Sequence, residues 1–398
     1  MSSPKNLIIE NQVKSKLGQA ISSKVDESSL DRLTLLTVGI IQSPSVSPSQ
    51  IAAGLAQLEL SNASEDSIER RIRRIENDPE LSAELCVHPF ARQRLLFGRP
   101  KRLYLIIDPT CQDDRIVKVT LGVWYRGRAL PICWTIWKGN TKLEKEVFWE
   151  EVETLLDQAK AILPKNIEVV VLGDRAFGTP AFTDLVVAKG WHFLVRVQDQ
   201  TRVLHPTLDE KGEAIGTLVE QGGFRRLKAK AFKKRGWRSC SVVVYWKKSF
   251  EGPLALVSSL PPDWNLIGMY RRRYLIETLF RDYKSKGFHF EESQVKDHDH
   301  LNVLLVGMAL ACWLCLLTGT QIAREYLASP ACGGRYTLPR IGKRSLFYLG
   351  LKRLGTYCIT SKSIVLNWQL EDWDAPCWSK QVLQHHRNAY KLPYDKAA

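Results

Sequence analysis

The sequence has few acidic residues for its length and lacks the segments that mark secreted or membrane proteins. Its 398 residues include 57 Lys and Arg but only 42 Asp and Glu, which gives a net charge of +15. No stretch near the N-terminus has an apolar core long enough for a signal peptide. The uncharged run Val303–Leu317 is shorter than the roughly 20 apolar residues of a bilayer span, so we expect a helix buried in a protein core.

The nine cysteines are odd in number and scattered, which argues against a disulfide framework and favours reduced thiols in the cytosol. Cys312 and Cys315 form a CxxC pair, but no second pair accompanies it, so a zinc or redox site is not expected. The excess of positive charge instead attracts polyanions and favours salt-sensitive, sequence-independent affinity for nucleic acid. An anionic membrane surface is the other candidate.

Four polar residues in the segment MYRRRYLIETLFRDYKSKG are spaced as neighbours on one helix face. Their separations of three, four and seven predict a single stripe of an α-helix at 3.6 residues per turn. Turn residues at Pro261–Asp263 and Gly287 mark the expected ends of this helix. Such a stripe buries little apolar surface, but it offers one carboxylate to a metal and three donors to phosphate. The four residues are Tyr270, Arg273, Glu277 and Lys284.

Two aspartates follow apolar runs that predict buried strands. From Tyr104 to Val197 the pattern predicts the order β-β-β-α-β-α-β, in which Asp108 ends the first strand and Asp174 the fourth. Reactive groups collect beyond the carboxyl ends of strands in α/β sheets, so we expect these carboxylates to meet there and Glu277 to complete the cluster. A single Asp after a strand is a common turn former. The joint occurrence of all three carboxylates indicates a catalytic site.

Three motifs together resemble those of bacterial insertion-sequence transposases with an Asp-Asp-Glu triad. They are Asp-x-Thr at 108–110, Asp-Arg-x-Phe at 174–177 and the Tyr-x2-Arg-x3-Glu-x6-Lys string that begins at Tyr270. The similarity runs from about Tyr104 to about Arg353. Resemblance to the group with this Tyr-Arg-Glu-Lys signature implies an RNase H-like α/β core with a β-rich insertion. It also implies a DNA transposase, which cleaves the ends of an insertion sequence and joins them to target DNA by metal-dependent hydrolysis and transesterification.

The three carboxylates fit the metal chemistry of that reaction. Mg²⁺ prefers hard oxygen ligands, and two ions about 3.5–4 Å apart stabilise the attacking and leaving oxygens of a phosphodiester. We therefore expect Asp108, Asp174 and Glu277 to be catalytic residues and ligands of two Mg²⁺ ions, for which Mn²⁺ could substitute. By resemblance, further donors would hold phosphates of the transposon end, and relatives often pass through a hairpin intermediate. These donors are Tyr270, Arg273, Lys284 and Arg175.

A pair of expected helices near the N-terminus could recognise the transposon end. The pattern predicts helices from Ser49 to about Leu58 and from about Glu65 to Asn77, with Ser64 as the cap of the second. Two helices and a turn suit a helix-turn-helix. A helical hairpin with a solvated basic face is the alternative. The basic residues of the second helix are Arg70, Arg71, Arg73 and Arg74.

The run Phe224–Lys248 contains ten basic residues and no acidic one. It falls within the expected insertion, where a basic β-ribbon could cover DNA and a Trp could receive an unstacked base. The alternative is that its tryptophans form the core of the insertion. The residues expected at DNA are Lys233, Lys234, Arg235 and Trp237. A later basic segment, Arg335–Arg353, could contact DNA, form a dimer contact or be only a surface helix; the sequence does not choose among these three interpretations.

These patterns predict four parts and a protein that works on DNA. The parts are a helical DNA-end-binding domain (1–100), the RNase H-like core (101–200 and 262–330), a basic β-rich insertion (201–261) and a basic C-terminal tail (331–398). The expected partners are double-stranded DNA, as transposon ends and target, and a second copy of the chain in a synaptic complex. No membrane is expected, and the location would be the bacterial cytoplasm and nucleoid. Alternatives are an RNase H-like nuclease without strand transfer, an inactive transposase-derived DNA-binding protein and, more remotely, a membrane-surface protein.

Overall fold

The computed structural model of the chain divides into two compact units. It describes residues 7–58, 63–98, 100–112, 116–139, 141, 143–328, 344–359, 366 and 368–370. The first unit is Met1–Pro100, Tyr125–Pro131 and Leu279–Ala398, and the second is Lys101–Trp124 and Ile132–Thr278. The expected boundary at residue 100 coincides with this division. The expected core range 262–330 is shared between the two units, and most of the expected tail 331–398 lies outside the described residues.

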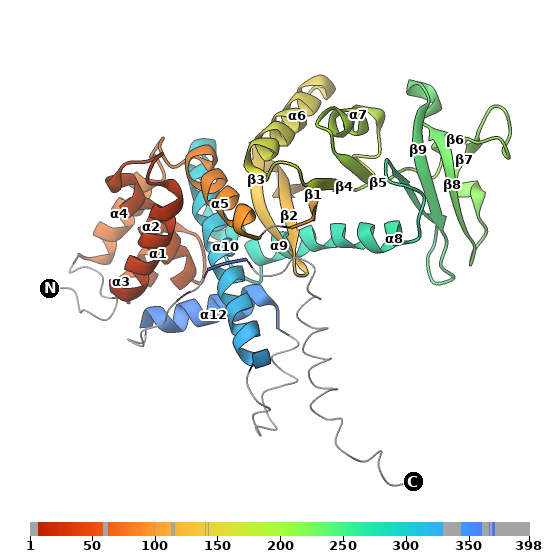
Figure 1. Ribbon diagram of the computed structural model, residues 1–398. Coiled ribbons are helices and arrows are strands. Elements are labelled where there is room, and N and C mark those ends of the chain that lie inside the picture. The colour runs from red at the N-terminus through yellow and green to blue at the C-terminus, as the bar shows by residue number, and fades with distance from the viewer. Residues whose placement is uncertain are drawn as a thin grey trace, which may run out of the picture. The chain divides into compact units, whose positions relative to one another are not determined.

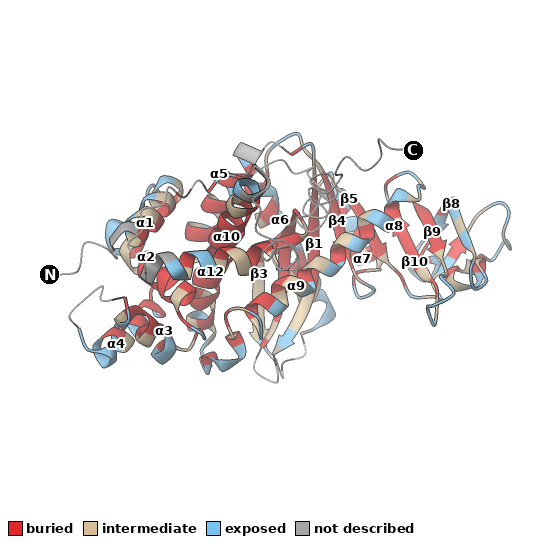
Figure 2. Ribbon diagram, turned by 90° about the horizontal axis from the view of Figure 1, so that it is seen from below, coloured by how far each residue is buried: buried red, intermediate tan, exposed pale blue. Residues whose placement is uncertain are grey.

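The first unit is helical. Its main elements are α1 (Leu7–Ile21), α2 (Glu27–Gln42), α3 (Pro48–Ala56), α4 (Glu65–Ile75), the π-helical η1 (Ala83–Val87), α5 (His88–Gly98), the 3₁₀ turn η5 (Phe290–Ser293), α10 (His298–Ala328) and α12 (Leu346–Ile359). Helix α10 packs against α2, α12 and η1, and Figure 2 shows it buried along most of its length. Within the described residues it is the one helix long and apolar enough to cross a membrane. However, 94% of that window is buried inside the protein, which is typical of the core helix expected around Val303–Leu317.

Helices α10 and α12 approach so closely that glycine is required at their crossing. A Cβ on Gly350 would overlap the carbonyl oxygen of Cys315, and a Cβ on Gly319 would overlap that of Leu346. Glycine lowers intrinsic helix stability, so its presence in both helices is explained by this backbone-to-backbone contact.

The second unit is built on one sheet of ten strands in the order β3-β2-β1-β4-β5-β10-β9-β8-β6-β7. The strands are β1 (Arg102–Gln112), β2 (Ile116–Tyr125), β3 (Arg128–Lys138), β4 (Glu168–Gly173), β5 (His192–Arg196), β6 (Arg202–Leu204), β7 (Glu213–Ala214), β8 (Phe224–Ala231), β9 (Arg238–Tyr245) and β10 (Leu254–Ser258). Two 3₁₀ turns, η2 (Ile215–Leu218) and η3 (Lys233–Arg235), connect strands. Helices α6 (Lys145–Ile162) and α7 (Pro180–Ala188) lie on one side of the sheet and α8 (Asn265–Tyr270) on the other (Figure 1).

The expected order β-β-β-α-β-α-β is confirmed by β1, β2, β3, α6, β4, α7 and β5. Strand β1 pairs antiparallel with β2 and parallel with β4, and β4 pairs parallel with β5. These central strands are largely buried on both faces, which explains why their sequences are nearly continuous apolar runs. The β2–β3 turn places Arg126 and Gly127 at positive φ, as a tight two-residue hairpin turn requires.

The segment 201–261 is β-rich as expected, and it extends the central sheet. Strand β10 pairs antiparallel with β5, through Leu256 opposite Arg196, and β9 and β8 follow in turn. The sheet therefore runs without a break from the strands that carry the aspartates into the basic segment.

Candidate active site

The two aspartates follow equivalent positions of two neighbouring parallel strands. The last paired residues of β1 and β4 are Ile107 and Gly173. Asp108 is the next residue of β1, and Asp174 comes directly after the end of β4. Both aspartates therefore lie directly beyond the parallel pairing, the place at which the strand pattern predicts that their carboxylates meet. Strand β1 does not end at Asp108, however, because antiparallel pairing with β2 extends it to Gln112.

A tight turn holds Asp174 in place. Its Oδ1 accepts the backbone N–H of Ala176 at 2.8 Å. Phe177 is fully buried in an aromatic cluster, and a Cβ on Gly173 would lie 2.7 Å from the Cβ of Phe177. A Cβ on Gly178 would overlap the carbonyl oxygen of Arg196. The Asp-Arg-x-Phe motif therefore uses its Phe to anchor a compact turn that fixes the carboxylate.

The segment that carries the signature is not the single α-helix that its spacing predicts. Helix α8 ends at Tyr270, a 3₁₀ turn, η4, spans Arg271–Tyr274, and α9 spans Leu275–Tyr283. The 3₁₀ turn lies against β1. The guanidinium of Arg272 sits 4.4 Å from the ring centre of Tyr104 and 4.9 Å from that of Trp124. Tertiary packing of this turn on the sheet has therefore overridden the regular helical period.

Arg273 joins the first and third carboxylates. Its Nη1 donates to Oδ1 of Asp108 at 3.3 Å and its Nη2 donates to Oε1 of Glu277 at 2.7 Å. Asp108 and Arg273 are both about nine-tenths buried, whereas the side chain of Glu277 is 48% exposed. Burial raises the pKa of Asp108 to about 7, Arg273 opposes this, and the charges of Asp174 and Glu277 add to it. The charges of Asp174 and Glu277 therefore both reach the carboxyl group of Asp108.

Tyr270 and Arg273 line a cleft of about 930 Å³ in the second unit. Burial raises the pKa of Tyr270 to about 12, so its phenol stays protonated at neutral pH. For Arg273, burial opposes the charge, but Asp108 and its other acidic neighbours outweigh it and raise the pKa. The cleft also contains Asp174 and three further arginines, which are Arg175, Arg196 and Arg271.

Arg196 is a site residue that sequence reasoning missed. Val195 of β5 pairs with Gly173 of β4, so Arg196 stands beside Asp174 on the next strand. Its Nε is buried and has no hydrogen-bond partner among the described residues. The rule that places the aspartates beyond the carboxyl ends of parallel strands could have found Arg196, since it follows the apolar run of the fifth strand.

Lys284, the last residue of the signature, belongs to the first unit. Its Nζ lies 3.2 Å from Oε1 of Glu291. The structure therefore brings Tyr270, Arg273 and Glu277 together within one unit, and it gives Lys284 an acidic partner elsewhere.

The donor chemistry of the three carboxylates fits a divalent cation. The charges of Asp174 and Glu277 disfavour the ionised form of Asp108, and a bound cation would offset this repulsion. Hard oxygen ligands such as carboxylates suit Mg²⁺. Within the residues that the structure describes, no three His, Cys, Asp or Glu side chains form a ready-made metal cluster. Arg273 instead spans the gap between Asp108 and Glu277.

The two helices expected near the N-terminus are confirmed as α3 and α4. The Ser64 hydroxyl accepts the N–H of Ser67 and caps α4. The isoleucine stripe of α4 is buried, and its four arginines are exposed. Arg73 pairs with Glu69 in the same helix at 2.7 Å.

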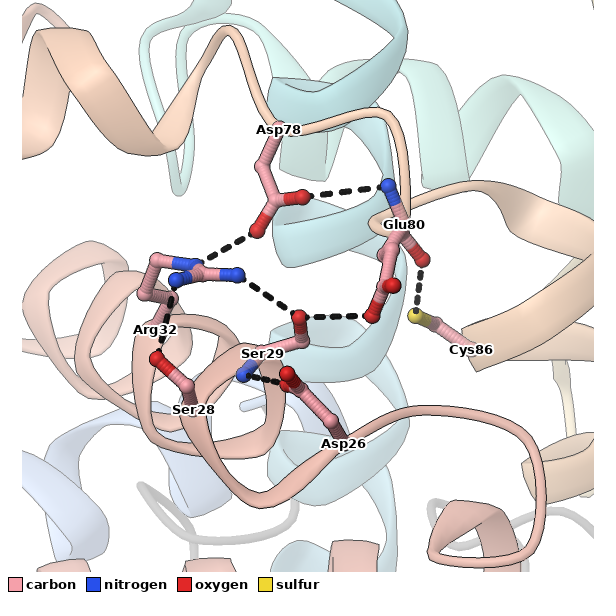
Figure 3. Close-up of polar contacts among 7 residues, drawn as sticks. All are labelled: Asp26, Ser28, Ser29, Arg32, Asp78, Glu80 and Cys86. Carbon is pink, nitrogen blue, oxygen red and sulfur yellow. Dashed lines mark hydrogen bonds and ion pairs between the residues drawn. The ribbon is translucent and has the colours of Figure 1, made fainter.

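A polar network fixes the chain that follows α4 (Figure 3). Arg32 of α2 donates from Nε to Oδ2 of Asp78 at 2.6 Å, and from Nη2 to the hydroxyl of Ser29 at 2.7 Å. That hydroxyl donates in turn to Oε2 of Glu80 at 2.8 Å. Because Asp78 is buried, these contacts tie the end of the α3–α4 pair firmly to α2.

The basic turn of the insertion is partly engaged in internal contacts. The Nζ of Lys233 donates to the carbonyl oxygen of Lys211 at 2.8 Å. Trp237 packs against Gly212, where a Cβ would lie 2.9 Å from its ring. Lys234 and Arg235 are exposed. The contact of Trp237 fits the alternative that it belongs to the insertion's packing.

Comparison with known proteins adds one family match. Residues 148–314 match the family model described as a transposase DDE domain. The match contains Asp174, Glu277 and the whole signature, begins after Asp108, and supports a DNA transposase function.

Solved structures also include similar chains. One is the cryo-EM structure of a piggyBac transposase synaptic complex with hairpin DNA, with a TM-score of 0.38 and 12% sequence identity over 86% of this chain and 85% of that chain. A search of curated proteins gives no match.

Proposed function

We propose that the protein is a metal-dependent DNA transposase, that it belongs to the insertion-sequence group with the Tyr-Arg-Glu-Lys signature, and that it has an RNase H-like core. One observation carries the proposal. Asp108 and Asp174 each follow the last parallel-paired residue of β1 and β4, and Arg273 links Asp108 to Glu277 at the wall of an arginine-lined cleft. The antiparallel β1–β2–β3 meander followed by parallel β4 and β5 supports the assignment of the core.

In this proposal Asp108, Asp174 and Glu277 would hold two Mg²⁺ ions, for which Mn²⁺ could substitute. Bound ions of this kind activate a nucleophile and stabilise the attacking and leaving oxygens of a phosphodiester. The protein's own contribution is to place the carboxylates at fixed positions and to offer donors beside them. Tyr270 remains a protonated donor, and the cleft arginines provide the charge that a phosphate backbone requires.

DNA recognition would use two further surfaces. The exposed arginines of α4 suit the transposon end, and Arg70, Arg71, Arg73 and Arg74 are all on its open face. The exposed insertion residues Lys234 and Arg235, with Lys233, suit the DNA backbone. Cutting two ends and joining them requires a synaptic complex, so we propose a homodimer on double-stranded DNA ends and target.

The experiment uses the purified full chain, Mg²⁺ and a duplex carrying the DNA that flanks the gene. Wild type is compared with Asp108→Asn, Asp174→Asn and Glu277→Gln, and with Glu146→Gln as a matched control on the exposed face of α6. We expect cleavage at the repeat ends and joined products for wild type and control. Each triad variant should lose about 10²–10³-fold in rate, the order expected when the electrostatic stabilisation at one position is removed.

Other outcomes would assign the chain differently. Cleavage without joined products would favour a nuclease that lacks strand transfer. Sequence-specific binding of the ends without cleavage by wild type would favour an inactive DNA-binding protein. Full cleavage by all three folded triad variants would remove the catalytic assignment.

A further inference from the structure

Strand β8 presents a row of exposed cations on one face. Along Phe224–Ala231 the exposed side chains alternate with less exposed ones. Successive side chains of a strand point to opposite faces, so Arg226, Lys228 and Lys230 share one face at steps of roughly 7 Å. The neighbouring residues across the ladder are Val243, Ser241 and Ser239, none of which is acidic.

The three cations of this row are uncompensated. In the described part of the chain, no carboxylate lies within ion-pair distance of Arg226, Lys228 or Lys230. Other cations nearby do have partners within the protein. Arg238 of β9 pairs with Asp184 at 3.1 Å, and Lys233 donates to a backbone carbonyl. The charge of the row is therefore available to a partner.

An aromatic pair stands at one end of the row. Phe224 is 62% exposed, and its ring meets that of Trp264 edge to face, with centroids 4.7 Å apart. The guanidinium of Arg226 lies 5.4 Å from the ring centre of Trp264. Contact of this kind orients a guanidinium over an aromatic face, so Trp264 holds the first cation of the row in place.

We infer that the Phe224–Lys230 face of β8 is a docking strip for the phosphate backbone of DNA. The inference rests on the proposed function and adds to it a surface distinct from the η3 turn. Evenly spaced cations without acidic neighbours complement the evenly spaced charges of a nucleic-acid backbone, whose binding is sequence-independent. The net charge of +15 favours the same partner.

Salt-dependent DNA binding by the full chain tests the strip. The probe is a fluorescent duplex of the flanking DNA, titrated at several salt concentrations. Each lost phosphate contact lowers the slope of log K against log salt by roughly 0.9. The triple variant Arg226→Gln, Lys228→Gln, Lys230→Gln should therefore lose about 2–3 in slope. Trp264→Leu keeps the three charges and should lose less than about 1.

A charge-matched control separates the strip from net charge. Lys145 and Lys160 are exposed on α6, and Lys165 is exposed just after it. Changing all three to Gln removes three positive charges, as the strip triple variant does. This control should keep the wild-type slope. If the strip triple variant unfolds, Lys228→Gln and Lys230→Gln alone should each lose about 1 in slope.

The outcomes are distinguishable. A wild-type slope in the folded strip variants overturns the docking strip and leaves the transposase function intact. An equal loss in the lysine control assigns the effect to net charge and also overturns it. Binding of wild type to phosphatidylserine vesicles, with no binding to the DNA probe, would contradict both the strip and the proposed function.

Discussion

Removing one partner of the Arg128–Asp282 ion pair should strongly destabilise the first unit. The Nη1 of Arg128 and the Oδ2 of Asp282 are 2.8 Å apart, and the side chains are 11% and 7% exposed. Burial raises the pKa of Asp282 to about 6 although Arg128 opposes the shift, and burial likewise lowers the pKa of Arg128. Desolvation therefore outweighs attraction for both groups. An unpaired buried charge costs about 3–5 kcal/mol.

A double-mutant cycle measures this coupling. Arg128→Met and Asp282→Leu should each lower the free energy of unfolding by about 3–5 kcal/mol, whereas the double variant should lose far less than their sum. The assay is urea unfolding of the full chain at pH 7, followed by tryptophan fluorescence with unfolding slopes compared. If the double variant loses the sum of the single effects within about 0.5 kcal/mol, the partners are not coupled and the reasoning fails.

The same pair predicts a pH dependence. The unfolded pKa of Asp is about 3.9, and the folded pKa of Asp282 is about 6, so the folded state binds the proton more tightly. Its contribution to stability is fully present below about pH 4 and is lost as the pH rises through about 6, a change of about 3 kcal/mol. Asp282→Asn should lack this part of the profile. Identical pH profiles for wild type and Asp282→Asn would contradict it.

Two further substitutions test packing at the turn and at the helix crossing. Arg272→Met should lower the free energy of unfolding by about 1–2 kcal/mol, because its stacking on Tyr104 and Trp124 is lost; an unchanged melting temperature would contradict this. Gly350→Ala should cost about 1–3 kcal/mol or more through overlap with α10. Gly355→Ala, on the same helix with only one distant neighbour at 3.8 Å, is the control and should be neutral or stabilising in thermal unfolding.

The sequence predicts those parts of the fold that depend on local pattern. Apolar runs and turn residues locate the strands that carry Asp108 and Asp174, and their order follows from the chain. The join between β5 and β10 could not be predicted, because it pairs strands separated by more than fifty residues. Helix α2 is buried over most of its surface, so it lacks the amphipathic stripe by which a surface helix is recognised.

The 3₁₀ turn that interrupts the helix in the signature segment explains which neighbours Tyr270, Arg272 and Arg273 contact. Residues three apart lie directly above one another in a 3₁₀ turn, which sets Tyr270 and Arg273 on the same side, where both line the cleft. The α-helix that follows makes residues four apart neighbours, so Arg273 also reaches Glu277. Arg272, one position earlier, faces away from them onto the aromatic side chains of the sheet. A continuous α-helix would place Tyr270 and Arg273 about 60° apart around its axis. The Tyr-x2-Arg-x3-Glu spacing therefore fits a change from 3₁₀ to α-helical geometry just after Arg273. This change allows one guanidinium to line the cleft and to bind both Asp108 and Glu277.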